Sequence, residues 1–158
     1  MQPNHEVARA VLDPSQLGRT LSFMRALLSV GHCLDSRSKR MNTRLGVTAS
    51  QRLMLRIIGR FPGVSAGELA QLMEVHASTV TGVLQRLEQR QLITRRADAG
   101  DRRRALFELT EAGAKLDALR TGTVEAAVRR AMARCDEEQV VAALHVLEQL
   151  RGELQRED

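Results

Sequence analysis

The spacing of the hydrophobic residues changes just after Gln91, and this change restricts the fold more than any other feature of the chain. Before Gln91, apolar residues recur every three or four positions, which predicts amphipathic helices. After it, residues 92–94 are β-prone, and the apolar residues Ala105, Phe107 and Leu109 take alternate positions. The turn-forming stretch Asp98-Ala-Gly-Asp101 lies between these two runs. We therefore expect a β-hairpin that follows directly on several helices.

Two capping boxes divide the helical region into short elements. Thr48-Ala-Ser-Gln51 and Ser65-Ala-Gly-Glu68 each place a hydroxyl residue three positions before Gln or Glu, so each begins a helix. A third helix begins near Ala77. The residues that we expect on the buried faces are Leu53, Met54, Ile57 and Ile58 in the first helix, Leu69, Leu72 and Met73 in the second, and Val80, Val83, Leu84 and Leu87 in the third.

Longer helices flank this region. Asp13-Pro14-Ser15-Gln16 is a helix start, and an apolar stripe follows it through Leu17, Leu21, Met24, Leu28 and Gly31 towards Leu34. The polar stretch 35–44 predicts that this helix frays there. Thr110 is expected to cap one long helix that runs from Glu111 towards Arg134. Asp136-Glu-Glu-Gln139 begins the last helix, on which apolar residues at 140, 143, 147, 150 and 154 keep a heptad-like spacing.

The fold class that follows is mainly α with a small β-hairpin wing, which describes a winged helix-turn-helix. Only three of the 158 residues are aromatic, all of them Phe, so aliphatic side chains must build the core, which favours helices. We expect an N-terminal helix at 14–44, a winged lobe at 45–110 and C-terminal helices at 111–156. One small lobe cannot cover the apolar stripes at both chain ends, so we expect the outer parts to form a dimer. Packing of the two stripes on each other within one chain is the alternative.

Positive charge is concentrated beside the hairpin. The chain has a formal charge of +5, and residues 86–104 contain seven arginines against three acidic residues, which accounts for +4 of it. A basic patch of this kind predicts a polyanionic partner. A solvated charge run is the alternative, but its position just downstream of short helices joined by a tight turn favours nucleic acid.

The third short helix carries residues that suit a DNA groove. Small hydroxyl side chains can meet bases or phosphates, while Gln and Arg one turn later can pair with adenine and guanine. Taken alone, the Ser/Thr-rich start is more typical of an ordinary helix cap; the neighbouring basic hairpin favours DNA. The candidate residues are Ser78, Thr79, Thr81, Gln85 and Arg86.

Four stretches of the chain carry a family resemblance. They are Leu45-Gly-Val-Thr-Ala-Ser-Gln51, Ser78-Thr-Val-Thr81 with Leu84 and Arg86-Leu-Glu88, Gln91-Leu-Ile93, and Asp101-x-Arg103-x-x-x-Phe107-x-Leu109-Thr110-x-x-Gly113. Together they resemble the MarR (multiple antibiotic resistance regulator) family of winged helix-turn-helix transcription regulators over residues 45–116. The flanking helices match by arrangement. Many relatives have Pro where Ala99 stands, which predicts a looser wing tip here.

The resemblance implies a homodimeric, sequence-specific transcription regulator, a repressor that a small-molecule effector releases from a pseudo-palindromic operator in double-stranded DNA. It implies that Arg103 enters the minor groove with Asp101 as its partner, and that Arg102 and Arg104 contact phosphates. Small lipophilic or phenolic effectors are typical of the family. The candidates for the effector pocket are Phe23, Met24, Met54 and Arg56, although each residue type is more often core or surface.

Cys33 supports two alternative functions. It follows His32, and a charged imidazole would make the thiol more reactive, so a thiol-based redox-sensing regulator of the same fold is one alternative. A lone Cys on a helix is more often inert packing. An enzyme that uses Cys33 and His32 is the other alternative. Adjacent residues on a helix point about 100° apart, so we expect no enzyme.

We expect neither a cofactor nor a metal, because the four histidines show no zinc-ligand spacing with Cys33 and Cys135. Two cysteines are too few for a disulfide framework. No N-terminal stretch has the form of a signal peptide, and the longest apolar runs are far shorter than a membrane span. The expected location is the reducing cytoplasm, with no membrane partner.

Overall fold

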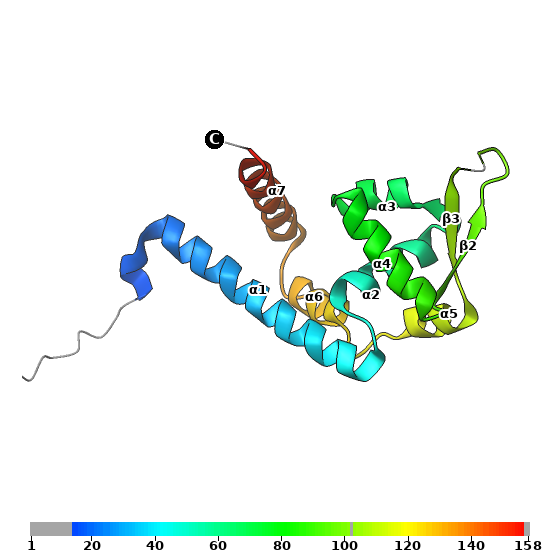
Figure 1. The fold of residues 1–158 in the computed structure, drawn as a ribbon. Coiled ribbons are helices and arrows are strands. Elements are labelled where there is room, and N and C mark those ends of the chain that lie inside the picture. The colour runs from blue at the N-terminus through cyan, green and yellow to red at the C-terminus, as the bar shows by residue number, and fades with distance from the viewer. Residues whose placement is uncertain (1–13, 102, 157–158) are drawn as a thin grey trace, which may run out of the picture. The chain divides into compact units, whose positions relative to one another are not determined.

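A computed structural model describes residues 14–101 and 103–156 of the chain (Figure 1). Arg102, a candidate phosphate contact, lies outside the described residues. Contacts within the chain divide it into two compact units, residues 1–36 and 37–158. The boundaries that we expect at 44/45 and 110/111 do not coincide with this division and stay predictions.

The described residues of the N-terminal unit, from Pro14 onward, are helical. A 3₁₀ turn, η1 (Pro14–Leu17), leads into α1 (Gly18–Leu45), and Gly18 takes the left-handed φ of +69° between them. The residues of the expected stripe are exposed within the chain, among them Leu21 (54%), Met24 (51%) and Leu28 (70%). This stretch of α1 therefore carries an apolar face that its own unit does not bury.

The second half of α1 does not fray, contrary to our expectation for residues 35–44. The helix continues to Leu45 because the neighbouring elements hold it. Met41 is fully buried, the Oγ of Ser38 accepts the N–H of Ala49 at 2.9 Å, and the Nε of Arg37 donates to the carbonyl oxygen of Thr123 at 3.2 Å. Tertiary contacts of this kind override a polar local sequence.

Three short helices form the body of the lobe: α2 (Ala49–Arg60), α3 (Ala66–Met73) and α4 (Ala77–Gln89). Both expected capping boxes are confirmed, at Thr48 with Gln51 and at Ser65 with Glu68. The core that the helices enclose is aliphatic apart from one ring. Its buried members are Val47, Met54, Leu55, Ile58, Val64, Leu69, Val80, Val83, Leu84, Leu87, Ile93 and Phe107.

Two expected core leucines are instead exposed. Leu53 on α2 is 51% exposed and Leu72 on α3 is 53% exposed. The buried face of α2 contains Met54, Leu55 and Ile58, which share one side of a helix with 3.6 residues per turn, whereas Leu53 points away from it. On α3, Leu69 supplies the buried contact, and Leu72 lines a hollow on the surface with Phe61.

The hairpin is confirmed, and a third strand extends it. β2 (Ile93–Ala97) and β3 (Ala105–Leu109) are antiparallel, with Arg95 opposite Phe107. The two-residue strand β1 (Val64–Ser65) pairs with the other edge of β3, so the order is β1-β3-β2. Since β1 also leads directly into α3, it joins the sheet to the helix-turn-helix.

The single helix that we expect from Glu111 towards Arg134 is in fact two helices, α5 (Glu111–Ala118) and α6 (Val124–Met132). The break has a local cause: Gly122 has a φ of +74°, and the Oγ1 of Thr123 accepts the N–H of Ala126 at 3.3 Å, which caps α6. It also has a tertiary cause, because the buried Arg52 bonds the carbonyl oxygens that end α5.

The packing at the start of α5 explains why Gly113, the last residue of the motif that begins at Asp101, is a glycine. Thr110 caps this helix through Gly113, and a Cβ at Gly113 would collide with the carbonyl oxygen of Leu92. The last helix, α7 (Glu137–Leu154), begins at the expected capping box of Asp136 with Gln139. None of the helices in the described part of the chain is long and apolar enough to cross a membrane.

Candidate nucleic-acid interface

Helix α4 is divided cleanly between a core face and a solvent face. Val80, Val83, Leu84 and Leu87 are all buried. All five candidate residues of this helix are exposed: Ser78, Thr79, Thr81, Gln85 and Arg86. A helix with polar, flexible readers on the side opposite its core contacts has the form of a recognition helix.

The turn before α4 has the geometry of a helix-turn-helix. Glu74 ends α3 in the left-handed conformation (φ 53°), and its N–H bonds the carbonyl oxygens of Ala70 and Gln71. His76 then occupies the N-cap of α4 without a side-chain capping bond. The N-terminal end of α4 has a partial positive charge, and its free backbone N–H groups can donate hydrogen bonds to a phosphate oxygen.

The tip of the wing is shaped by aspartates and not by a left-handed glycine. The Oδ1 of Asp98 accepts the N–H of Gly100 at 2.9 Å, and the Oδ1 of Asp101 accepts the N–H of Arg103 at 2.9 Å. The turn-forming stretch 98–101 contains Gly100, but Gly100 is not among the glycines with positive φ. These Asx contacts add to the backbone turn in which the N–H of Arg104 donates to the carbonyl oxygen of Asp101 at 2.9 Å, and together they fix the tip locally.

The wing arginines occupy different positions. Arg103 is exposed, and Asp101 contacts its backbone N–H. Arg104 turns back to the lobe, where its Nη2 lies 2.6 Å from the Oε1 of Glu68 and 3.2 Å from the Oγ of Ser65. On β2, Arg96 pairs with Glu108 at 3.0 Å, with both side chains largely in solvent. Arg103 is therefore presented outward, whereas Arg104 already has an acidic partner.

The contact between Glu68 and Arg104 shifts the pKa of both groups. The hydrogen bond from Arg104, followed by those from the backbone and side chain of Ser65, lowers the pKa of Glu68 to about 2. The same bond to Glu68 raises the pKa of Arg104. Both groups are therefore fully ionised at neutral pH.

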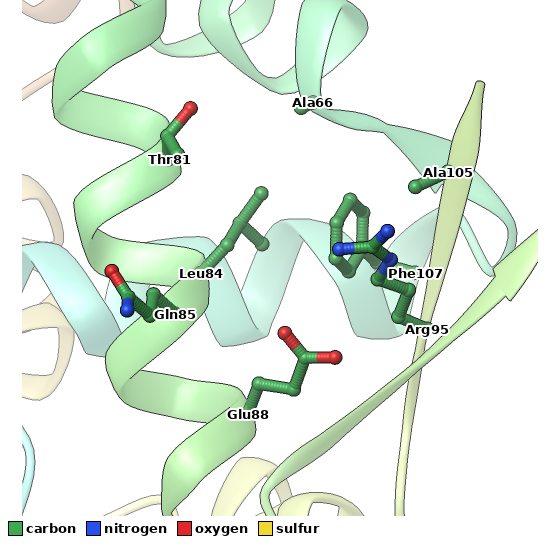
Figure 2. A pocket seen from close by; sticks show the side chains of 8 residues that line it. All are labelled: Ala66, Thr81, Leu84, Gln85, Glu88, Arg95, Ala105 and Phe107. Carbon is green, nitrogen blue, oxygen red and sulfur yellow. The ribbon is translucent and has the colours of Figure 1, made fainter. Parts of the chain in front are cut away.

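A hollow of about 460 Å³ separates α4 from the sheet (Figure 2). Its floor is apolar, formed by Leu84, Phe107 and the small residues at 66 and 105. Thr81, Gln85 and Glu88 line it from the helix, and Arg95 lines it from β2. The structure therefore brings two of the candidate readers to the same hollow as a basic side chain of the wing.

The weaker candidate sites are spread along the chain. Phe23 and Met24 are exposed on α1, whereas Met54 is fully buried in the lobe core. Arg56 is bound to Asp117 through an ion pair of 2.9 Å. Cys33 is exposed on α1. In the described part of the chain, no three His, Cys, Asp or Glu side chains are grouped as metal ligands would be.

Two residues of the lobe were not predicted to have any role. The sequence indicates Glu68 only as half of a capping box, and it indicates no role for Arg52. Nothing in the local sequence indicates that Glu68 would meet a wing residue far along the chain. Arg52 is 1% exposed, and only the position of the α5–α6 turn explains why a charge is buried there.

Comparison with known proteins gives one consistent result. The MarR family model matches residues 45–104. The HTH-type transcriptional repressor MdtR of Bacillus subtilis strain 168 is 33% identical over 106 residues, which cover 66% of this chain and 68% of that protein. The crystal structure of the S. aureus MepR–DNA complex has a TM-score of 0.69 at 24% identity, covering 87% and 99% of the two chains. The crystal structure of MarR has a TM-score of 0.61 at 26% identity, covering 83% and 90%.

Proposed function

The chain belongs to the MarR family of winged helix-turn-helix transcription regulators, and we propose that it acts in the cytoplasm as a homodimeric, sequence-specific DNA-binding repressor. The observation that carries the proposal is the pairing of two features in one lobe. The solvent face of α4 consists of groove-reading residues, and the adjacent wing presents an exposed arginine at its tip. A solvated charge run would need neither the recognition helix nor the ordered tip.

In this proposal α4 enters the major groove. Ser78 and Thr79, at the start of the helix, contact phosphates or base edges, and Thr81 lies one turn further along the same side. Gln85 and Arg86 read bases, since Gln suits adenine and Arg suits guanine. Phosphate contacts at the helix N-terminus fix the register of the helix in the groove.

The wing adds a second contact in the minor groove. Arg103 enters that groove, where the narrow walls concentrate negative potential around a guanidinium. Asp101 holds the backbone of Arg103 through the 2.9 Å bond and thereby sets the direction in which the side chain leaves the tip. Arg102 is assigned to a phosphate by resemblance alone. The same resemblance assigns a phosphate to Arg104, which the structure pairs with Glu68.

Dimerisation is supported by the exposed apolar faces of the terminal helices. On α1, Leu21 and Leu28 are more than half exposed; on α7, Val141 and Leu144 are each 55% exposed. Apolar side chains exposed together on one helix are typical of a surface that another copy covers. Two winged lobes in one dimer read two half-sites, which gives an operator of pseudo-palindromic form.

Release by a small lipophilic or phenolic effector is proposed from the family resemblance. Phe23, Met24 and Arg56 are the accessible candidates for contact with such a molecule. Met54 is enclosed in the core, so it contacts an effector only if the lobe opens.

A thiol-based switch at Cys33 is the second candidate, favoured by the exposure of this side chain on α1. Loss of the peroxide response of DNA binding in Cys33→Ser, with binding itself retained, identifies the thiol switch. An unchanged response rejects it.

Selection of bound duplexes from a random DNA pool tests the proposed function. We expect a pseudo-palindrome whose half-sites are centred about one helical turn, roughly 10 base pairs, or a multiple of it apart. The matched control is the triple variant Ser78→Ala, Thr79→Ala, Arg86→Ala, which keeps the core face of α4 intact. If the wild-type protein enriches no sequence, or if the variant enriches the same one, α4 is not the reader.

A further inference from the structure

The two carboxylate oxygens of Glu68 have separate partners. Oε2 accepts the N–H of Ser65 at 2.8 Å and the hydroxyl of Ser65 at 2.7 Å, which completes the capping box of α3. Oε1 lies 2.6 Å from the Nη2 of Arg104. Because the capping box holds the carboxylate on the first turn of α3, Oε1 is a fixed anchor and not the end of a freely moving side chain.

Arg104 lies at the end of the wing-tip turn, directly before β3. Its N–H donates to the carbonyl oxygen of Asp101 at 2.9 Å, and its carbonyl oxygen accepts the N–H of Asp98 at 2.9 Å. Its side chain bonds Glu68 and also donates to the Oγ of Ser65 at 3.2 Å. One residue therefore closes the tip through its backbone and attaches the tip to the N-terminus of α3 through its side chain.

We propose that Glu68 and Arg104 are positioning residues, which set the direction of the wing tip relative to the helix-turn-helix. The proposal rests on the proposed DNA-binding function. Arg103 is the next residue along the chain and leaves the tip in the direction that the anchored backbone gives it. This positioning role differs from the phosphate role that the resemblance implies for Arg104.

The sign of the effect of Glu68 on DNA binding separates this proposal from simple electrostatics. A carboxylate close to DNA repels phosphates, so its removal alone strengthens binding. If Glu68 positions the wing, its removal weakens binding. The low pKa of Glu68, about 2, agrees with a carboxylate that stays charged and bound to Arg104 at neutral pH.

The variant Glu68→Gln tests the proposal, because Gln at this position still completes a capping box but cannot form the ion pair. The matched control is Glu88→Gln, which removes an exposed acidic charge from α4 at the hollow between helix and wing. Fluorescence anisotropy with the selected operator at fixed salt measures each Kd. We expect Glu68→Gln and Arg104→Gln to bind roughly two- to five-fold more weakly, without additivity in the double variant, and Glu88→Gln to bind as tightly as wild type or more tightly.

The same substitution in an Arg103→Ala background shows whether the pair acts through Arg103. We expect Glu68→Gln to have little effect there, since the side chain to be positioned is absent. Glu68→Gln binding as tightly as wild type overturns the proposal, as does an equal fold loss in both backgrounds. A merely structural role would lower affinity equally with and without Arg103.

A measurement on the free protein separates this inference from the proposed function. The ¹⁵N heteronuclear NOE values of the Gly100 and Arg103 amides report fast motion of the tip. We expect these values to fall in Glu68→Gln and Arg104→Gln but not in Glu88→Gln. If they fall while the wild-type protein binds no duplex, the positioning pair stands and the DNA-binding function fails. Unchanged values overturn the positioning role itself.

Discussion

Replacement of Arg52 by Met is expected to destabilise the protein strongly, because this buried guanidinium holds the turn between α5 and α6. Arg52 Nε donates to Glu125 Oε1 at 2.7 Å. Its Nη2 donates to the carbonyl oxygens of Asp117 at 3.2 Å and Leu119 at 2.8 Å, and its Nη1 donates to that of Leu116. Met fills a similar volume but offers no donor.

The size of the expected loss in the free energy of unfolding follows from the polar groups that lose Arg52 as their partner. Arg52 is 1% exposed and Glu125 is 31% exposed, so one partner of the pair is fully removed from water. Desolvation raises the pKa of Glu125, but hydrogen bonds from its own backbone and from Arg52 outweigh it, so that this pKa is lowered overall. Removal of one member of such a pair, together with donors to three carbonyl oxygens, costs about 3–5 kcal/mol.

Urea unfolding at fixed protein concentration measures this loss, and fixed concentration matters because association stabilises the folded chain. Arg120→Met is the matched control: Arg120 donates to the same Asp117 carbonyl oxygen at 2.7 Å, but from an exposed position. We expect the control to change the free energy of unfolding by no more than about 0.5 kcal/mol. A loss below about 1 kcal/mol in Arg52→Met would refute the view that a buried arginine fixes the α5–α6 turn.

Three further predictions concern the dimer, the wing and the DNA contacts. Leu147→Glu, in the exposed face of α7, is expected to halve the mass found by light scattering because it buries a charge in the proposed dimer contact; an unchanged mass would place the contact elsewhere. The pKa of Glu68 is lowered from 4.5 to about 2, so its contribution to stability is present above pH 4.5 and is lost as the pH falls towards 2. A ¹³C titration of the carboxyl carbon should show a midpoint near 2, whereas a midpoint near 4.5 would mean that the Arg104 pair does not form. Because the arginines are clustered, a plot of log Kd against log salt concentration is expected to be steep, with a slope of about one unit per phosphate contact. A flat plot would mean that the arginine patch faces another partner.

The parts of the fold that could be predicted are those that local periodicity specifies. Val80, Val83, Leu84 and Leu87 repeat at helical spacing, and their burial follows from that spacing alone. The capping boxes at Thr48, Ser65 and Asp136 likewise need only residues three positions apart. The hairpin was predictable because turn-forming residues lie between a β-prone run and a run of alternating apolar residues.

The parts that escaped prediction depend on contacts between distant residues. Leu53 and Leu72 have the composition of core residues, and only the packing of α2 and α3 shows that they face outward. β1 has two residues, too few for any periodicity, and it exists because β3 offers a free edge. The Glu68–Arg104 pair joins the capping box to the wing tip across 36 positions, so no local pattern could reveal it.

The affinity of Arg103→Ala for the selected operator, measured at one fixed salt concentration, tests the central claim most directly. Arg103 is exposed at the wing tip, and its replacement leaves the Asp101 contact to the backbone N–H in place. If the wing reads DNA together with α4, we expect binding to weaken by about 1–3 kcal/mol, or roughly 5- to 150-fold in Kd. A Kd equal to that of the wild-type protein would contradict the account of the wing as a DNA contact.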